Sequence, residues 1–263
     1  MICNKCKAEF ADNAEFCPVC GVKLKDGDVA NRDRVFDLFK EIFSDNLFMI
    51  LTAIVGLKGV LDFLDEGLIS AAVCIISAVS MWTLYSAATK ERLLDAYVTP
   101  LKTLKVLANI NFVIIRVVWI ILAVTGAVVL LIHFYYDGQI FDSNEYYEIF
   151  DGLKFIPAQW VVPAIGVGIL LAALVLMVIN RFYYGNLLIL SESFYESAKN
   201  DSLNLKKVST VKKWLVVMSA YELVSDAAML TSMDALSIVI ALFNIAVYMT
   251  AFVWLNKLVE KLQ

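Results

Sequence analysis

Four of the five cysteines in this chain lie close together near its N-terminus. They are Cys3, Cys6, Cys17 and Cys20, which form two C-x2-C pairs separated by ten residues. In each pair one tight turn can aim both sulfurs at a common point, and two such turns supply the four thiolates of a tetrahedral zinc site. The spacing therefore predicts one structural zinc ion held by two β-hairpin knuckles within residues 1–25.

Other uses of these cysteines stay open at this stage. Two disulfides would require an oxidising compartment, and a redox-active C-x-x-C pair normally follows a strand and begins a helix. An iron–sulfur centre is another four-thiolate site. A catalytic zinc needs an open coordination position, which four thiolates would close. The spacing and the closed four-thiolate shell favour structural zinc among these alternatives.

Residues 1–25 resemble the zinc-ribbon module found at the N-terminus of many prokaryotic membrane proteins, especially Gram-positive ones. The second knuckle, F-C-P-V-C-G at Phe16–Gly21, matches that pattern closely. The first departs from it, because Lys7 follows Cys6 where the family often has glycine. The resemblance covers less than a tenth of the chain, and it implies a polytopic membrane protein of unassigned function.

The charge of this segment bears on its partners. Residues 1–25 contain four lysines against Glu9, Asp12 and Glu15, and a zinc tetrathiolate adds a charge of roughly −2. Attraction to phosphate is therefore weak, in line with the net charge of −4 for the whole chain. We expect no nucleic acid partner and predict contact with a cytosolic protein or with the chain itself.

The rest of the chain, which must position this segment, is strongly apolar. Hydrophobic residues make up 60% and charged residues 18% of the 263 residues, against roughly 45–50% and 25% in soluble proteins. Runs of about 20 apolar residues are long enough to cross a bilayer. The sequence predicts an all-α integral membrane protein with six transmembrane helices in residues 46–263, at about 46–64, 67–89, 111–136, 157–180, 214–233 and 235–256.

The distribution of lysine and arginine supports this topology. If both termini are cytosolic, 19 of the 22 basic residues lie in cytosolic segments and only Lys154 lies outside, while Lys58 and Arg116 fall within spans. Such an asymmetry follows the positive-inside rule. The first residues do not resemble a secretory signal peptide. We therefore expect a multi-pass protein of the cell membrane with cytoplasmic N- and C-termini.

Residues 26–45 link the two parts. Their apolar residues recur at helical spacing, which predicts an amphipathic helix lying on the inner membrane surface. A stiff connection that holds the ribbon near the bilayer is the plainer interpretation. Segments 67–136 and 157–233 each pair two spans around a lysine-bearing segment, and whether they form an internal repeat stays open.

Five charged residues within or near the predicted spans form a candidate polar site, because charges in the bilayer usually face a partner or a cavity. They are Lys58, Asp62, Arg116, Glu222 and Asp226. In one hypothesis, Lys58 pairs with Glu222 or Asp226 while Asp62 reaches the outer surface. In the other, the carboxylates form a proton or cation path. Arg116 is expected to extend to the interface.

Enzymatic chemistry has little support. His133 is the only histidine, and the chain lacks the P-loop, H-E-x-x-H and G-x-S-x-G motifs. The pair Gly166-x-Gly168 indicates a close helix contact. We therefore predict a membrane scaffold or regulator that acts through protein contacts. The alternative is a small-solute or ion transporter with an accessory zinc ribbon, and an intramembrane enzyme is a third possibility.

Overall fold

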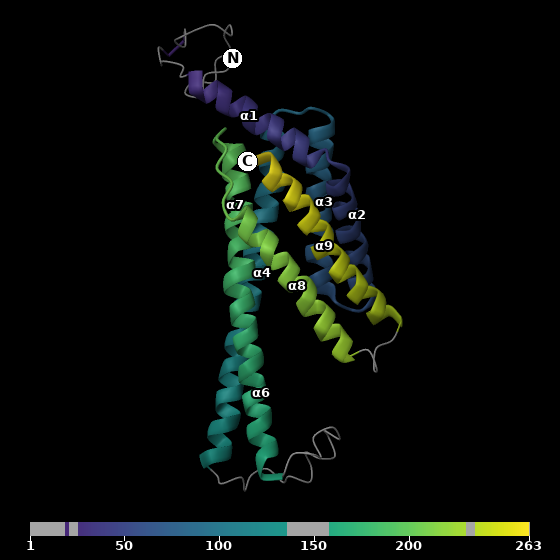
Figure 1. The fold of residues 1–263 in the computed structure, drawn as a ribbon, viewed down its shortest axis with the longest axis vertical. Coiled ribbons are helices and arrows are strands. Elements are labelled where there is room, and N and C mark those ends of the chain that lie inside the picture. The colour runs from purple at the N-terminus through teal and green to yellow at the C-terminus, as the bar shows by residue number, and fades with distance from the viewer. Residues whose placement is uncertain (1–18, 21–25, 136–157, 230–234, 263) are drawn as a thin grey trace. The chain divides into compact units, whose positions relative to one another are not determined.

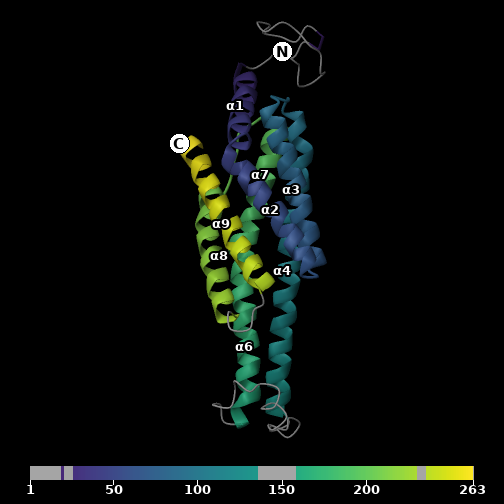
Figure 2. The same cartoon turned by 90° about the vertical axis from the view of Figure 1, so that its right-hand side faces the viewer.

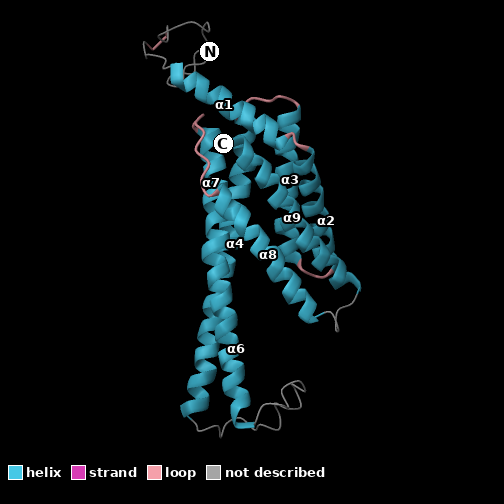
Figure 3. Ribbon diagram, in the orientation of Figure 1, coloured by secondary structure: helices cyan, strands magenta, loops and turns pink. Residues whose placement is uncertain are grey.

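The computed structural model describes residues 19–20, 26–135, 158–229 and 235–262 (Figure 1). Every regular element in these residues is a helix (Figure 3), which confirms the all-α prediction for them. The helices are α1 (Asp26–Phe43), α2 (Asn46–Leu64), α3 (Leu68–Thr89), α4 (Asp95–Tyr135), α6 (Ala158–Ile179), the π-helix η2 (Asn180–Tyr184), α7 (Gly185–Lys199), α8 (Val208–Met229) and α9 (Ala235–Leu262).

Five helical segments are long and apolar enough to cross a membrane, so the chain is a multi-pass membrane protein. They are Asn46–Leu64, Leu68–Thr89, Asp95–Tyr135, Trp160–Lys199 and Leu236–Leu262. The predicted span at 214–233 coincides with α8, which carries four charged residues and is not among the five. Part of that span lies outside the described residues. The sixth crossing therefore stays a prediction.

The chain divides into two compact units. The first contains Met1–Ala108 and Asn186–Gln263, and the second contains Asn109–Gly185. One boundary falls within α4 and the other at the start of α7. The first unit includes α1, α2, α3, α8 and α9, and the second contains the later part of α4 together with α6 and η2.

In the first unit, α2 and α3 form an antiparallel hairpin that packs closely. Asp45 caps α2 by accepting a hydrogen bond from the Leu47 N–H over 2.7 Å. A Cβ atom on Gly59 would lie 2.9 Å from Ile75 Cγ1 and 3.1 Å from Cys74 Cβ. Only glycine therefore allows the two helices to approach this far. Helix α2 also packs on α9, which in turn packs on α8.

In the second unit, α4 and α6 run side by side (Figures 1 and 2). A Cβ atom on Gly126 would lie 3.0 Å from the Gly166 carbonyl oxygen, and one on Gly166 would lie 2.8 Å from Leu130. Small residues allow this approach in a membrane. The predicted helix contact is confirmed for Gly166, whereas a Cβ on Gly168 would meet open space.

Two of the helices are longer than the predicted spans. Helix α4 has 41 residues, which at 1.5 Å per residue corresponds to about 60 Å. Helix α6 continues through η2 and α7 as far as Lys199. Much of the two predicted basic segments that flank these spans is therefore helical and continuous with them.

Candidate functional site

The predicted zinc site falls almost entirely outside the described residues. Of its four cysteines, only Cys20 lies within them, in the turn at residues 19–20. Across the described parts of the chain, no group of three or more His, Cys, Asp or Glu side chains could hold a metal ion. The zinc ion and its four ligands therefore remain predictions.

Helix α1, which follows the ribbon segment, is buried on its apolar side. Val35 and Phe39 have no exposed surface, and Ile42 and Phe43 expose 3% and 2%. The sequence predicted a helix here whose apolar side rests on lipid. In the structure, protein side chains cover that side instead, because aromatic residues from distant parts of the chain pack against it.

These side chains form an aromatic cluster, defined here as Phe39, Phe43, Phe48, Tyr97, Phe194 and Trp254. Phe43 is central to it. Its ring centroid lies 5.0 Å from that of Phe48, 6.0 Å from those of Tyr97 and Phe194, and 6.1 Å from that of Trp254. Aromatic pairs at such distances contribute about 0.5–1.5 kcal/mol each beyond the burial of their surface.

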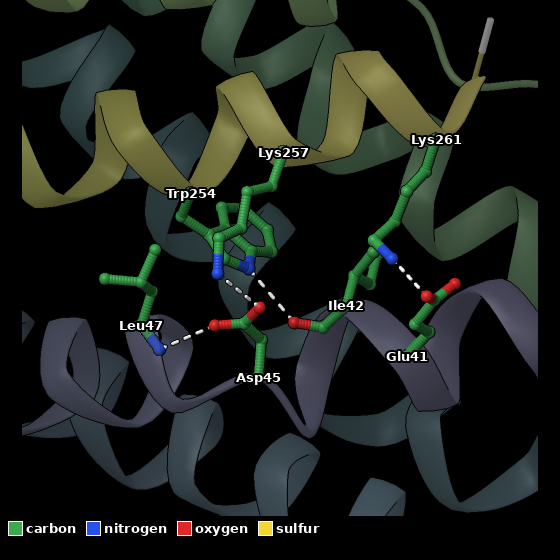
Figure 4. A network of polar contacts seen from close by, with 7 residues as sticks. All are labelled: Glu41, Ile42, Asp45, Leu47, Trp254, Lys257 and Lys261. Atoms are coloured by element: carbon green, nitrogen blue, oxygen red, sulfur yellow. Dashed lines mark hydrogen bonds and ion pairs between the residues drawn. The ribbon is translucent and has the colours of Figure 1, made fainter.

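The aromatic cluster joins the ends of several helices. Phe48 lies in the first turn of α2, Tyr97 in the first turn of α4, Phe194 in α7 and Trp254 near the end of α9. Trp254 also donates a hydrogen bond from Nε1 to the Ile42 carbonyl oxygen over 3.0 Å (Figure 4). Helix α1 is therefore fixed against four other helices of its unit.

Ion pairs surround this cluster. The Lys257 ammonium lies 2.9 Å from an Asp45 carboxylate oxygen, and Lys261 pairs with Glu41 (Figure 4). Both pairs connect the end of α9 to the α1–α2 junction. On another side of α1, Lys40 lies 2.7 Å from the Glu91 carboxylate just after α3, and Arg32 lies 3.9 Å from Asp201.

The surroundings of Asp45 and Glu91 favour their charged forms. Burial raises the pKa of Asp45, but hydrogen bonds from Lys257 and the Leu47 N–H, with the charges of Lys257 and Lys261, leave that pKa below its ordinary 3.8. A hydrogen bond from Lys40 and its positive charge lower the pKa of Glu91. Both carboxylates are therefore ionised at neutral pH, as their ion pairs require.

Among the predicted intramembrane residues, Lys58 and Asp62 come together. Lys58 Nζ lies 2.6 Å from Asp62 Oδ2. Ser70 Oγ donates a hydrogen bond to the same oxygen, and Cys74 Sγ lies 3.8 Å from it. Asp62 is only 6% exposed. This oxygen is thus surrounded by donors from α2 and α3.

The expectation that Asp62 reaches the outer surface is therefore wrong. Lys58 forms an ion pair with Asp62 on its own helix, a partner that the sequence interpretation did not name. The reason is geometric. Residues four apart share one face of a helix, and Gly59 brings that face of α2 against α3. The pair is closed between two helices, which favours a structural role.

The other three candidates belong to other helices, α8 and α4. Glu222 lies half-buried in α8, and the side chain of Asp226 lies outside the described residues. Arg116 belongs to the second unit, where its guanidinium lies over the Phe112 ring at 5.7 Å from the centroid. The choice between a transport path and a structural pairing for Glu222 stays open.

The aromatic cluster is the feature that the sequence interpretation missed. Its signal was present in α1, whose phenylalanines recur on one face, but the partners at positions 97, 194 and 254 carry no local sign of a common location. The fold and these contacts describe an α-helical multi-pass membrane protein with a helix, α1, held against its bundle. No known protein family, characterised protein or solved structure matches the chain.

Proposed function

We propose that this protein is a membrane scaffold or regulator that presents an N-terminal zinc ribbon at the cytosolic face of the cell membrane. The observation that carries the proposal is the fixed position of α1. A flexible tether would leave the ribbon free, whereas α1 is held by the aromatic cluster and by ion pairs to α9 and to the segment after α3. A rigid mount suits a module that contacts a partner in a defined orientation.

The proposed topology has six spans with both termini in the cytosol. The contact between Asp45 and Lys257 brings the start of the first candidate span beside the end of the last. Helices that begin and end on the same side of a membrane require an even number of crossings. Five candidates are already present, so the contact supports α8 as the sixth, and the 19 basic residues favour the cytosolic side for the ends.

The ribbon, with Cys3, Cys6, Cys17 and Cys20 as zinc ligands, is proposed to contact a cytosolic protein or the protein's own helical bundle. Its four thiolates would close the metal site, so the proposed role is non-enzymatic. Transport is the weaker candidate, because Lys58 and Asp62 satisfy each other between α2 and α3.

A comparison of two cysteine variants tests this proposal. In the first, all four ribbon cysteines are changed to serine, and in the matched control only Cys74, in α3, is changed to serine. We expect the full-length wild type and the Cys74→Ser control to retain about one zinc per chain and the same cross-linked partner, or the same ribbon-to-bundle cross-links. The four-serine variant should lose both the metal and those cross-links.

Two results would contradict the proposal. The first is a four-serine variant that keeps every specific cross-link of the wild type. The second is a wild type without any ribbon cross-link that carries solute across the membrane of reconstituted vesicles. That second result would favour the transporter.

A further inference from the structure

Two arginines of the second unit are exposed beside apolar, membrane-spanning segments. Arg116 lies on α4, and its described contact is with the ring of Phe112, one turn earlier. Arg181 is the second residue of η2, next to Phe182, which is 46% exposed. Across the described parts of the chain, no carboxylate forms an ion pair with either arginine.

The packing of the two helices places these arginines at the same level. Gly126 of α4 faces Gly166 and Leu170 of α6, and a Cβ atom on Gly185 would lie 3.6 Å from the Phe112 ring. The two helices are antiparallel, so moving four residues forward from Phe112 in α4 reaches about the same height along the pair as moving four residues back from Gly185. Arg116 therefore lies level with Arg181.

Helical geometry also places them on the same side of the pair. An α-helix turns by about 100° per residue. Each arginine is rotated by roughly 50° about its own helix axis from the centre of the face that contacts the other helix, and the sense of rotation along the chain is the same for both. In an antiparallel pair, equal rotations in the same sense end on the same side. The two arginines thus flank one site at the edge of the helix contact.

The surface that continues from this site along the two helices is apolar. Four exposed aliphatic side chains extend from the arginines toward the far end of the pair, at Ile120, Val124, Leu174 and Val178. A ligand that fits both features has an anionic group for the arginines and hydrocarbon chains for this surface. Arginine pairs with phosphate through two parallel hydrogen bonds, and it does so best where water is scarce.

We propose that Arg116 and Arg181 together bind the phosphate of an anionic phospholipid, whose acyl chains lie along α4 and α6. An exposed guanidinium in a span or at its end is unfavourable without a partner. A lipid phosphate supplies a partner where the described residues offer no paired carboxylate. Two positive charges favour a lipid with net negative charge over a zwitterionic one. The site itself rests on the helix pair alone, and only its assignment to the inner leaflet rests on the proposed topology.

Lipid titration of the full-length protein tests this proposal. The purified, delipidated protein in neutral detergent is titrated with phosphatidylglycerol or phosphatidylcholine, and bound lipid is counted by native mass spectrometry. The variants are Arg116→Gln, Arg181→Gln and their combination. Lys102→Gln is the matched control, because it removes one exposed positive charge from α4 outside the site.

We expect the wild type and Lys102→Gln to bind one phosphatidylglycerol at least about tenfold more tightly than phosphatidylcholine. The double glutamine variant should lose this preference, and each single variant should lose part of it. A double lysine variant keeps the charge but not the forked geometry, so its affinity should fall between the two. It also provides the test if the glutamine variants do not fold, as judged by gel filtration and circular dichroism.

Three outcomes would overturn the proposal. In one, a folded double glutamine variant binds phosphatidylglycerol as tightly as the wild type. If that variant does not fold, the corresponding outcome is a double lysine variant that binds phosphatidylglycerol as tightly as the wild type. In another, Lys102→Gln loses as much affinity as the double variant, which would indicate general charge attraction. In the third, millimolar inorganic phosphate displaces the lipid completely, which would identify a site for a soluble phosphate rather than for a lipid.

Discussion

The surroundings of α1 and the α4–α6 pair hold helices together in opposite ways. Around α1, large aromatic rings meet at helix ends, and Phe39 and Phe43 are almost fully buried. Between α4 and α6, Gly126 and Gly166 let the backbones approach, while many aliphatic side chains stay exposed. Lipid is as apolar as leucine, so helices within the bilayer gain little by hiding apolar surface and associate through close packing.

The rigidity of each region has a different source. The aromatic cluster gathers side chains from five helices, so its removal should loosen several elements at once. The α4–α6 contact depends on the space left by two missing side chains, so it is sensitive to added volume rather than to lost volume. The predictions below test these two sensitivities.

The largest effect is expected for Phe43→Ala. Removing a buried aromatic ring lowers the free energy of unfolding by about 3–5 kcal/mol, through lost burial and the cavity left behind. Phe182→Ala, at an exposed position of η2, should change it by less than about 1 kcal/mol. Reversible unfolding of both variants in mixed micelles measures the difference, and equal losses would show that the cluster does not stabilise the protein.

A comparable loss in the free energy of unfolding is expected on breaking the ion pair between Lys58 and Asp62 in the first unit. Asp62→Ala leaves the Lys58 ammonium without its partner on a side chain that is only 17% exposed, which should destabilise the protein by up to about 3–5 kcal/mol. Replacing both residues, as Lys58→Met with Asp62→Leu, should restore most of this stability. A double variant less stable than Asp62→Ala would contradict the structural role of the pair and favour a functional one.

A smaller effect is expected in the second unit on adding a single methyl group. Gly166→Ala would place a Cβ atom 2.8 Å from the Leu130 side chain, and such overpacking destabilises by about 1–3 kcal/mol. Gly168→Ala meets open space and should stabilise the helix by up to about 1 kcal/mol. Opposite signs in an unfolding assay would confirm the α4–α6 contact, whereas equal signs would argue against it.

The smallest effect concerns the ion pair between Asp45 and Lys257. The pKa of Asp45 is lowered in the folded state, so its contribution is complete well above pH 3.8 and disappears as the pH falls through the folded-state value. Asp45→Asn keeps a side chain that can cap α2 but removes the charge. Unfolding measured between pH 7 and pH 3 should show the wild type losing about 0.5–1 kcal/mol more than this variant. A parallel decline of both would exclude a role for the Asp45 charge.

The same two regions show which structural features could be predicted from sequence patterns. The pair Gly166-x-Gly168 predicted a close helix contact, and the structure confirms it at Gly166, because glycine in an apolar helix has few other uses. Lys58 pairs with Asp62 on its own helix, a partner that i,i+4 spacing offers before any other helix is considered, whereas the sequence interpretation named Glu222 or Asp226. Helix α4 begins at Asp95, well before the span predicted at 111–136, because the apolar run that defined the span does not include the more polar start of the helix.

By itself, the sequence determined the all-helical class and the multi-pass character, because both depend on the length and apolar content of local segments. Its two C-x2-C pairs also predict a zinc ribbon, which stays a prediction. Only the tertiary structure decided what covers α1, since Tyr97, Phe194 and Trp254 come from helices far apart in the chain. It likewise decided that Arg116 and Arg181 lie level on one side of a helix pair. Such contacts between residues of different helices depend on helix register and packing, which the spacing of residues within one segment does not determine.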